Sequence, residues 1–334
     1  MRLGLCLGRN SGVTICKYLL AMSLAETIKH EARSLGFDAV GIAAVNPQAA
    51  DDRLLHRLQA WLLRGFHGTM GWMARDPARR ADPRVVLPGC RSIIVVGMNY
   101  DSGHRATEGQ GYGRIARYAW GRDYHRILGD RLALLEAKLH ERAPGAVTRS
   151  YVDTGPLMEK AWAQQASLGW IGKHSNLVSA DHGSWLVLGE ILTTIDLPPD
   201  TPAMDLCGSC SLCIQACPTQ AITEPYVVDA TRCISYLTIE FRGAREEIAD
   251  DLATGMGNHI FGCDDCLDVC PFNLRAEPTT DSAFQPLPAT LAPRLEELAG
   301  LDEGTFVERF RQSPIRRATL SGLRRNVAIA QENE

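Results

Sequence analysis

The stretch Cys207-Gly-Ser-Cys210-Ser-Leu-Cys213-Ile-Gln-Ala-Cys217-Pro218 decides which fold to expect in the second half of the chain. Its spacing, C-x2-C-x2-C-x3-C-P, is the one by which bacterial ferredoxins hold iron–sulfur clusters. Four thiolates lie within eleven residues and supply the sulfur ligands that such clusters need. In two-cluster ferredoxins the fourth cysteine binds the other cluster, so this spacing predicts further cysteine ligands downstream.

A second cysteine group, Cys263-Asp-Asp-Cys266-Leu-Asp-Val-Cys270-Pro271, has one cysteine fewer than the first. Cys233 lies between the two groups and can supply the missing ligand. Ferredoxin spacing then predicts two [4Fe–4S] clusters with four thiolates each. The first cluster takes Cys207, Cys210, Cys213 and Cys270, and the second takes Cys217, Cys233, Cys263 and Cys266.

The alternative is a pair of structural zinc sites, because paired C-x2-C spacings also bind zinc. The C-x3-C-P spacing occurs twice and favours iron–sulfur clusters. The remaining cysteines, Cys6, Cys16 and Cys90, fit neither spacing, and we expect them to be buried or incidental thiols.

Length and composition describe a globular protein. The chain has 334 residues, of which 45% are hydrophobic and 22% charged, enough for two or three domains. The net charge of −4 excludes an overall basic composition, so any RNA-binding surface must be local. Eleven cysteines in a chain of this length do not form the framework of a small secreted domain, and the metal-ligand spacing predicts the reducing cytoplasm.

The order of expected elements divides the chain into four parts. Residues 1–21 fit neither a signal peptide nor a membrane span, because Arg9-Asn10-Ser11-Gly12 interrupts their apolar pieces, and we interpret them as an extension or a mis-assigned start. Strands alternate with helices over 22–200, which predicts an α/β domain within an α/β or α+β multidomain protein. A ferredoxin-like domain over 201–275 and a short helical segment over 276–334 follow.

The hydrophobic periodicity of the sequence and the positions of its glycines and prolines predict the individual helices and strands. We expect helices at 23–35 (with Ser23 as N-cap), 51–64, 124–142, 157–168, 293–299, 303–311 and 316–330. We expect strands at 38–45, 92–98, 147–152 and 185–195. The apolar run at 92–98 predicts a strand buried on both faces.

Asp153 is the candidate catalytic residue, because it follows a predicted strand in Tyr151-Val152-Asp153-Thr154-Gly155-Pro156. Strand ends in α/β sheets border ligand crevices, and a carboxyl group in apolar surroundings gains a raised pKa that suits proton donation. The alternative role of Asp153 is N-cap of the following helix. A Rossmann dinucleotide site is unsupported, because no G-x-G-x-x-G follows a strand.

Two further loops have open interpretations. The stretch GWIGKHSN at 169–176 has two glycines that allow close approach of a flat ligand, or it forms a helix end and turn. His125 is either a proton shuttle or ligand contact, or a histidine with a structural role.

Together these motifs resemble the epoxyqueuosine reductase family over residues 22–330. The resemblance rests on RDPARRADPR at 75–84, YAWGRDYH at 118–125, VDTGPLMEKAWA at 152–163, GWIGKHSN at 169–176, and both cysteine groups with Cys233. It implies an enzyme that reduces epoxyqueuosine to queuosine at the wobble position of the tRNAs for Asp, Asn, His and Tyr. Electrons would pass through two [4Fe–4S] clusters to cobalamin, held as cob(II)alamin in an N-terminal cobalamin-binding domain.

The resemblance also implies roles for single residues. Asp153 would be the proton donor, and Asp153, Leu177, Leu188 and Ser235 would contact cobalamin. Arg242 matches a position that contacts tRNA. The implied partners are tRNA and a low-potential electron donor, with no membrane, and the enzyme would be a monomer. Some family members continue into HEAT-like repeats, so we expect a short form here.

The last part of the chain carries a basic stretch between Glu308 and Glu332. Its six arginines are Arg309, Arg311, Arg316, Arg317, Arg324 and Arg325. Such a stretch suits a phosphate backbone, and the alternative is a solvated helical face.

Two other functions remain as alternatives. A reductive dehalogenase with a similar cofactor plan is expected to carry a twin-arginine export signal, which the first residues lack. A ferredoxin-type electron-transfer module would leave the large N-terminal domain unexplained.

Overall fold

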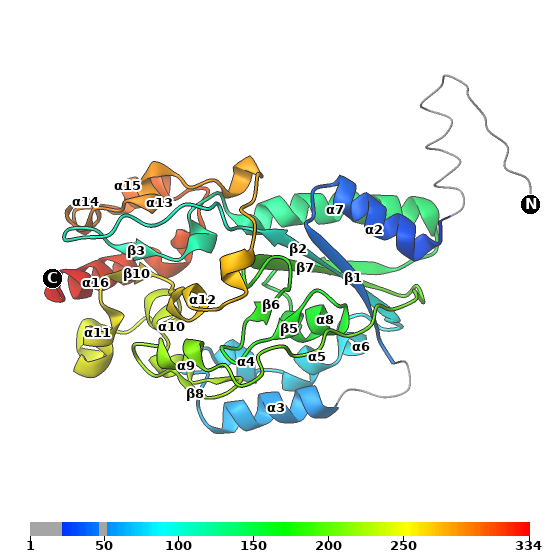
Figure 1. The fold of residues 1–334 in the computed structure, drawn as a ribbon, viewed down its shortest axis with the longest axis horizontal. Coiled ribbons are helices and arrows are strands. Elements are labelled where there is room, and N and C mark those ends of the chain that lie inside the picture. The colour runs from blue at the N-terminus through cyan, green and yellow to red at the C-terminus, as the bar shows by residue number, and fades with distance from the viewer. Residues whose placement is uncertain (1–21, 47–51) are drawn as a thin grey trace, which may run out of the picture.

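The computed structural model describes residues 22–46 and 52–334. The predictions for residues 1–21, Cys6 and Cys16 included, lie outside the described residues. The first half is built on a four-stranded sheet with the strand order β1-β2-β7-β4 (Figure 1). Its strands are β1 (Ala39–Ala44), β2 (Ser92–Asn99), β7 (Leu186–Thr193) and β4 (Thr148–Tyr151).

Every pairing in this sheet is antiparallel. The predicted mixture of strands and helices is confirmed, but the alternation does not produce the parallel sheet that it often accompanies. The central strand β2 is buried along its whole length, as its apolar run predicted.

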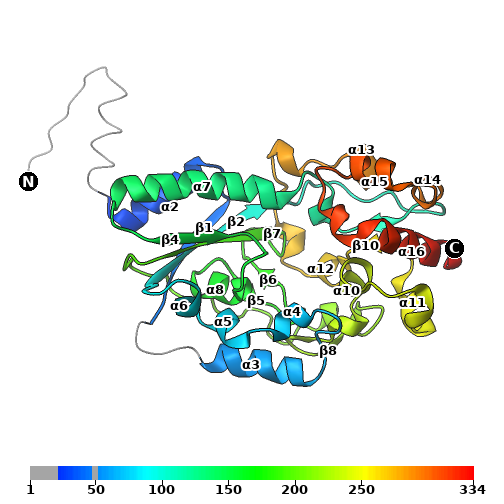
Figure 2. The ribbon, with the colours of Figure 1, turned by 180° about the vertical axis from the view of Figure 1, so that it is seen from behind.

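Helices cover both faces of the sheet (Figures 1 and 2). On one face, α2 (Leu24–Ser34) and α7 (Tyr124–Arg142) pack against Ile94 and Val96 of β2. On the other, α8 (Glu159–Gln165) packs against Ile93 and Val95. This alternation follows from the period of two along a strand. The same side of the sheet also carries α3 (Asp52–Leu63), α4 (Gly71–Ala74), α5 (Pro77–Ala81) and α6 (Pro83–Val86).

Two local predictions about helix starts have different outcomes. Ser23 is the N-cap of α2 and forms a capping box with Glu26, as predicted. The alternative role of Asp153 as an N-cap is wrong, because α8 begins at Glu159 and its N-cap is Met158. The stretch at 169–176 forms a hairpin between β5 (Trp170–Ile171) and β6 (Leu177–Val178).

The cysteine-rich part consists of short elements separated by loops. They are α9 (Leu212–Gln215), β8 (Ile222–Glu224), β9 (Val227–Val228), α10 (Ile234–Ile239), α11 (Asp250–Met256), β10 (His259–Phe261) and α12 (Asp265–Asp268). Strand β10 pairs in parallel with β3 (Arg114–Ile115), which comes from the connection between β2 and α7. The cysteine-rich part is therefore joined to the first half by main-chain hydrogen bonds.

The chain ends in α13 (Pro288–Leu291), α14 (Leu295–Ala299), α15 (Glu303–Arg309) and α16 (Thr319–Glu332). Leu323 and Val327 of α16 are buried in a core shared with Phe261 of β10. Asn326 of α16 is fully buried and donates to the carbonyl groups of Thr238 and Ile260. Among the described residues, no helix is long and apolar enough to cross a membrane.

Candidate active site and cluster cavities

The cysteines predicted for the second cluster, Cys217, Cys233, Cys263 and Cys266, line one cavity of about 250 Å³. Burial raises the pKa of the Cys266 thiol well above its ordinary value, and charge on Cys233 and Cys217 raises it further. Burial likewise raises the pKa of Cys233 and of Cys263. Four thiols this close together are hard to deprotonate unless a cation is nearby. Iron provides that cation, because the thiols bind it as thiolates and its positive charge stabilises them.

The cysteines predicted for the first cluster also lie together. Burial raises the pKa of Cys213 and of Cys270, and charge on Cys207 and Cys210 adds to the effect in both. Trp170 donates from Nε1 to the sulfur of Cys207 over 3.4 Å. Cys210 is exposed, so this group lies nearer the surface than the second one.

His174 places an unpartnered nitrogen in the cavity of the second group. Its Nδ1 accepts a hydrogen bond from the main-chain N–H of Asn176 over 3.1 Å, so the proton of the neutral ring is on Nε2. That Nε2 is buried and has no partner among the described residues. Burial lowers the pKa of His174 to about 4, so the ring is neutral near pH 7. A buried, unpartnered N–H on a residue that lines a cavity with four thiols suits a sulfide or thiolate acceptor, which supports a cluster in this cavity.

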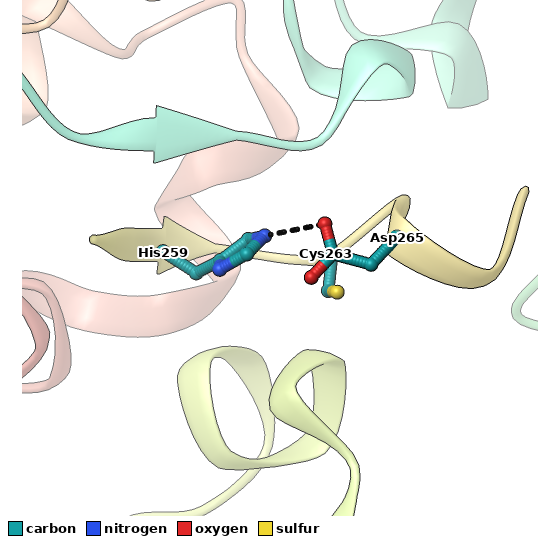
Figure 3. Close-up of side chains that lie close together, drawn as sticks. All are labelled: His259, Cys263 and Asp265. Carbon is teal, nitrogen blue, oxygen red and sulfur yellow. Dashed lines mark hydrogen bonds and ion pairs between the residues drawn. The ribbon is translucent and has the colours of Figure 1, made fainter. Parts of the chain in front are cut away.

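Figure 3 shows His259, Cys263 and Asp265 close together, and Cys263 and Asp265 line this cavity. Their potential ligand atoms lie within 4.8 Å of one another. His259 Nε2 is 3.2 Å from Asp265 Oδ1, and the same carboxylate oxygen is 3.2 Å from the Arg114 guanidinium. Because Cys263 also belongs to the four-cysteine group, we interpret His259 and Asp265 as supports of its loop.

Three of the four residues implied for cobalamin, Leu177, Leu188 and Ser235, line a second cavity of about 180 Å³, and Asp153 is not among its lining residues. They come from β6, β7 and α10, and no spacing in the sequence brings them together. Lys160, Asn176, Ser235 and Cys263 line both cavities, so the two are neighbours. The buried hydroxyl of Ser184 lines the second one and has no partner among the described residues. Leucine side chains mixed with hydroxyl, amide and charged groups fit part of a large flat cofactor that carries amide side chains.

Asp153 has a strained main chain. Its φ of 56° is in the left-handed region, and the N–H of Thr154 donates to the carbonyl of Val152 over 2.5 Å. A hydrogen bond between residues i and i+2, with a positive φ at residue i+1, defines a classic γ-turn, which is rare and strained. A Cβ at Gly155 would lie 2.6 Å from the ring of Tyr151, so the turn requires glycine there. The Asp153 side chain is 58% exposed.

His125 lies between two carboxylates. Its Nδ1 is 2.7 Å from Asp123 Oδ1, and its Nε2 is 3.3 Å from Asp153 Oδ2. Burial lowers the pKa of His125, but the two carboxylates outweigh burial and raise it to about 9. The hydrogen bond from His125 lowers the pKa of Asp153. The expected raised pKa of Asp153 is therefore wrong for this arrangement, and the proton resides on His125.

Two buried acids behind Asp153 were missed by sequence reasoning. Glu190 on β7 is fully buried, and neither of its carboxyl oxygens has a partner among the described residues. It is paired in the sheet with Tyr151, two residues before Asp153. Burial raises the pKa of Glu190 well above its ordinary value. Burial and the charge on Asp153 raise that of Glu159 to about 8. Both carboxyl groups therefore hold protons near pH 7, and the signal in the sequence was one acid within an apolar strand.

The arginines of the last part mostly bind other parts of the chain, which corrects their interpretation as a free phosphate-binding face. Arg325 donates to the carbonyl groups of Leu237, Phe241 and Gly243. The other bonded arginines and their partners are Arg309 with Glu297, Arg311 with Glu308, Arg317 with Glu240, and Arg324 with the Leu301 carbonyl. Arg316 is exposed, and among the described residues its side chain alone of the six has no such partner.

Arg242 is exposed, but its guanidinium donates to the carbonyl groups of Arg317 and Ala318. These contacts fix it beside the start of α16. The implied contact with tRNA is not tested by this geometry, and Arg242 stays a predicted tRNA contact.

Two family models match parts of this chain. Residues 206–273 match the family model described as a 4Fe-4S double cluster binding domain, which favours clusters over the zinc alternative. Residues 80–154 match the model described as epoxyqueuosine reductase QueG, DUF1730. An epoxyqueuosine reductase of Synechocystis is 46% identical over 288 residues, 86% of this chain and 98% of that protein. That of Escherichia coli K12 is 42% identical over 314 residues, 93% of this chain and 81% of that protein.

Two solved structures agree with these relatives. A crystal structure of epoxyqueuosine reductase with an epoxyqueuosine-modified tRNA-Tyr stem loop has a TM-score of 0.86 and 32% identity, covering 93% of this chain and 81% of that one. A structure of the Bacillus subtilis enzyme, with its catalytic loop swung out of the active site, has a TM-score of 0.85 and 31% identity over the same shares.

The fold, the double-cluster domain and these matches define an iron–sulfur oxidoreductase. The chain belongs to the epoxyqueuosine reductase family. The predicted resemblance, the mixed α/β fold and the enzyme class are thereby confirmed. The ligand of each cluster, the roles of single residues and the domain limits at 22, 201 and 276 stay predictions, as do the cytoplasmic location and the monomeric state.

Proposed function

We propose that this enzyme reduces the epoxide of epoxyqueuosine in tRNA to the alkene of queuosine, with electrons from two [4Fe–4S] clusters and with cobalamin as cofactor. The observation that carries the proposal is the contact between the two cavities, since four residues line both the cysteine cavity and its neighbour. The family relatives over 86% and 93% of the chain support the reaction. They do not favour the alternatives of a reductive dehalogenase or a plain electron-transfer module.

The chain's residues have separate parts in holding the cofactors. Cys207, Cys210, Cys213 and Cys270 hold the outer cluster, and Cys217, Cys233, Cys263 and Cys266 hold the inner one. Leu177, Leu188 and Ser235 hold cobalamin in the neighbouring cavity. When bound, cobalamin supplies the low-potential metal centre that delivers electrons to the epoxide.

Asp153 and His125 supply protons. The overall reaction consumes one epoxide, two electrons and two protons, and yields one alkene and one water. The oxygen of an opening epoxide is far more basic than a carboxylate, so it takes a proton through Asp153, and His125 restores that proton over the 3.3 Å contact. Burial and, after it, the charge of Asp153 raise the pKa of Tyr118, which lines the cobalamin cavity, so the acid lies near that cavity.

The RNA substrate binds through local contacts, because the chain as a whole is not basic. The solved relative with a modified tRNA stem loop supports tRNA as the partner. The exposed Arg316 offers a phosphate contact, and Arg242 is the second candidate. A single-stranded wobble base can enter a pocket without opening of a duplex, which suits this kind of recognition.

The decisive experiment combines reconstitution with nucleoside analysis. The enzyme, loaded anaerobically with iron, sulfide and cobalamin, is mixed with epoxyqueuosine-containing tRNA and dithionite. We expect about eight iron atoms per chain, a corrinoid spectrum and conversion to queuosine. A chain that binds no corrinoid, or leaves epoxyqueuosine unchanged, would contradict the proposal.

A further inference from the structure

Exposed apolar side chains gather in the cysteine-rich part. Six of the large apolar side chains exposed in the described residues lie between positions 204 and 274. That stretch is about a fifth of the chain, so the concentration is more than scattered surface hydrophobicity.

Three of these side chains are next to a cysteine of the outer group. Leu206 precedes Cys207, Leu212 precedes Cys213, and Val269 precedes Cys270, with exposures of 51%, 46% and 36%. Because the four thiols are predicted to converge on one cluster, their neighbours surround the same point. Helix α9, which carries Leu212, is in contact with α12, which ends one residue before Val269. Met204 and Leu274, 78% and 80% exposed, lie three residues before Cys207 and four residues after Cys270 in the sequence. We call Met204, Leu206, Leu212, Val269 and Leu274 the apolar ring.

The inner group has no such surroundings. Ile234 follows Cys233 and Leu267 follows Cys266, and both are buried. The apolar ring is therefore a property of the outer group alone, where Cys210 reaches the surface.

Charged groups close to the apolar ring make polar contacts within the chain. Lys173 donates to the carbonyl groups of Gly208 and Cys210 over 2.7 and 2.8 Å. Asp205 accepts hydrogen bonds from the hydroxyl of Tyr226 and the N–H of Cys207. Asp268 is 2.7 Å from the Arg117 guanidinium. The exposed Arg275 is left at the rim, so contact here depends on apolar area more than on ion pairs.

We propose that the apolar ring is the docking surface for a small one-electron carrier protein of the ferredoxin type. The inference rests on the proposed function, in that it requires an outer cluster under the ring. In each encounter the reduced carrier loses one electron and the outer cluster gains it. Two encounters supply the two electrons for one epoxide, and the two protons come from solvent. Small, short-lived contacts are typical of electron-transfer partners, and a ring of five side chains suits that size.

The test measures cluster reduction without tRNA, so its failure is distinct from failure of the proposed reaction. The loaded enzyme is mixed with a reduced plant-type [2Fe–2S] ferredoxin, whose visible bands differ from those of [4Fe–4S] clusters. The variant is Met204→Gln with Leu274→Gln, because neither side chain adjoins a cysteine and neither is packed in the core. The matched control is Leu63→Gln with Leu134→Gln on α3 and α7, where exposures are 89% and 55%.

We expect the ring variant to accept electrons from ferredoxin roughly tenfold more slowly at limiting concentration, since replacement of two exposed apolar contacts by amides weakens docking by about that factor. Reduction by dithionite, which needs no docking, stays unchanged, and the control variant matches the wild type with both reductants. The slowing persists in high salt, because salt does not screen apolar contacts. An unchanged ferredoxin rate, or equal slowing with dithionite, would overturn the inference.

Discussion

Asp153 and His125 form a pair in which the acid expected to donate a proton does not hold it at rest. The γ-turn aims the Asp153 carboxylate at His125, and the imidazolium lowers its pKa. The two residues thus have separate tasks. Asp153 contacts the reacting oxygen, and His125 holds the proton at rest.

Replacement of Asp153 by Asn or Ala should reduce turnover of epoxyqueuosine by a factor of about 100 or more, the usual range for loss of a positioned acid. Iron content should stay at the wild-type level because no cysteine contacts change, and corrinoid content should stay there because Leu177, Leu188 and Ser235 still line the cavity. Nucleoside analysis of the tRNA measures the loss, and turnover near the wild-type rate would remove Asp153 from the role.

The His125 pair should also stabilise the fold in a pH-dependent way. The pKa of His125 is raised to about 9, so its contribution is complete below about pH 6.5 and is lost as pH rises through 9. Because both side chains are partly exposed, we expect no more than about 1 kcal/mol. Urea unfolding of wild type and His125→Gln at pH 6.5 and pH 9.5 measures it. A difference that grows with pH would contradict the assignment.

Glu190→Gln should show a pH dependence of the same sign that begins at a lower pH. The pKa of Glu190 is raised by burial, so the wild type loses stability as pH rises above about 4.5, where the unfolded carboxyl ionises and the folded one does not. The amide does not titrate, so the variant gains on the wild type by up to about 1.4 kcal/mol per pH unit. Unfolding measured at pH 5 and pH 7 tests this, and a constant difference would mean that Glu190 is ionised in the fold.

At the scale of elements, Cys233 depends on a short helix for its position. It is the N-cap of α10, far from both cysteine groups in the sequence, yet it lines their cavity. Cys233→Ala should lower iron from about eight to about four atoms per chain. Cys90→Ala is the matched control, because Cys90 is a buried thiol outside both groups, as expected from the sequence. Iron analysis after reconstitution measures both, and full iron content in Cys233→Ala would refute the ligand assignment.

Helix α16 and the turn before it separate two kinds of arginine. Arg316→Glu should weaken tRNA binding and flatten its salt dependence, because it removes an exposed cation without internal bonds.

Arg325→Ala should instead lower the free energy of unfolding by about 1–3 kcal/mol, because three carbonyl groups lose a charged donor. Filter binding and urea unfolding measure the two effects. Equal tRNA affinity in Arg316→Glu would leave that arginine without an RNA role.

For the whole molecule, the sequence predicts most elements and the grouping of the cysteines, because both depend on local spacing. Helix 124–142 and the buried strand at 92–98 agree with α7 and β2 to within a residue. The antiparallel strand order, the pairing of His125 with Asp153 and the burial of Glu190 depend on contacts between distant segments. No periodicity encodes such contacts. The arginine stretch was misjudged for the same reason, since its carbonyl partners come from α10 and the following loop.

The pairing of β3 with β10 has a consequence for how the enzyme matures. Strand β3 is made early in synthesis, whereas β10 and the Cys263 loop that it carries are made late. Pairing between segments so far apart closes slowly, because a long loop must be ordered before any contact forms. The inner cysteine cavity is therefore completed only after nearly the whole chain has left the ribosome. Cluster insertion is a late step of biogenesis, and iron must be delivered to a chain that is already almost folded.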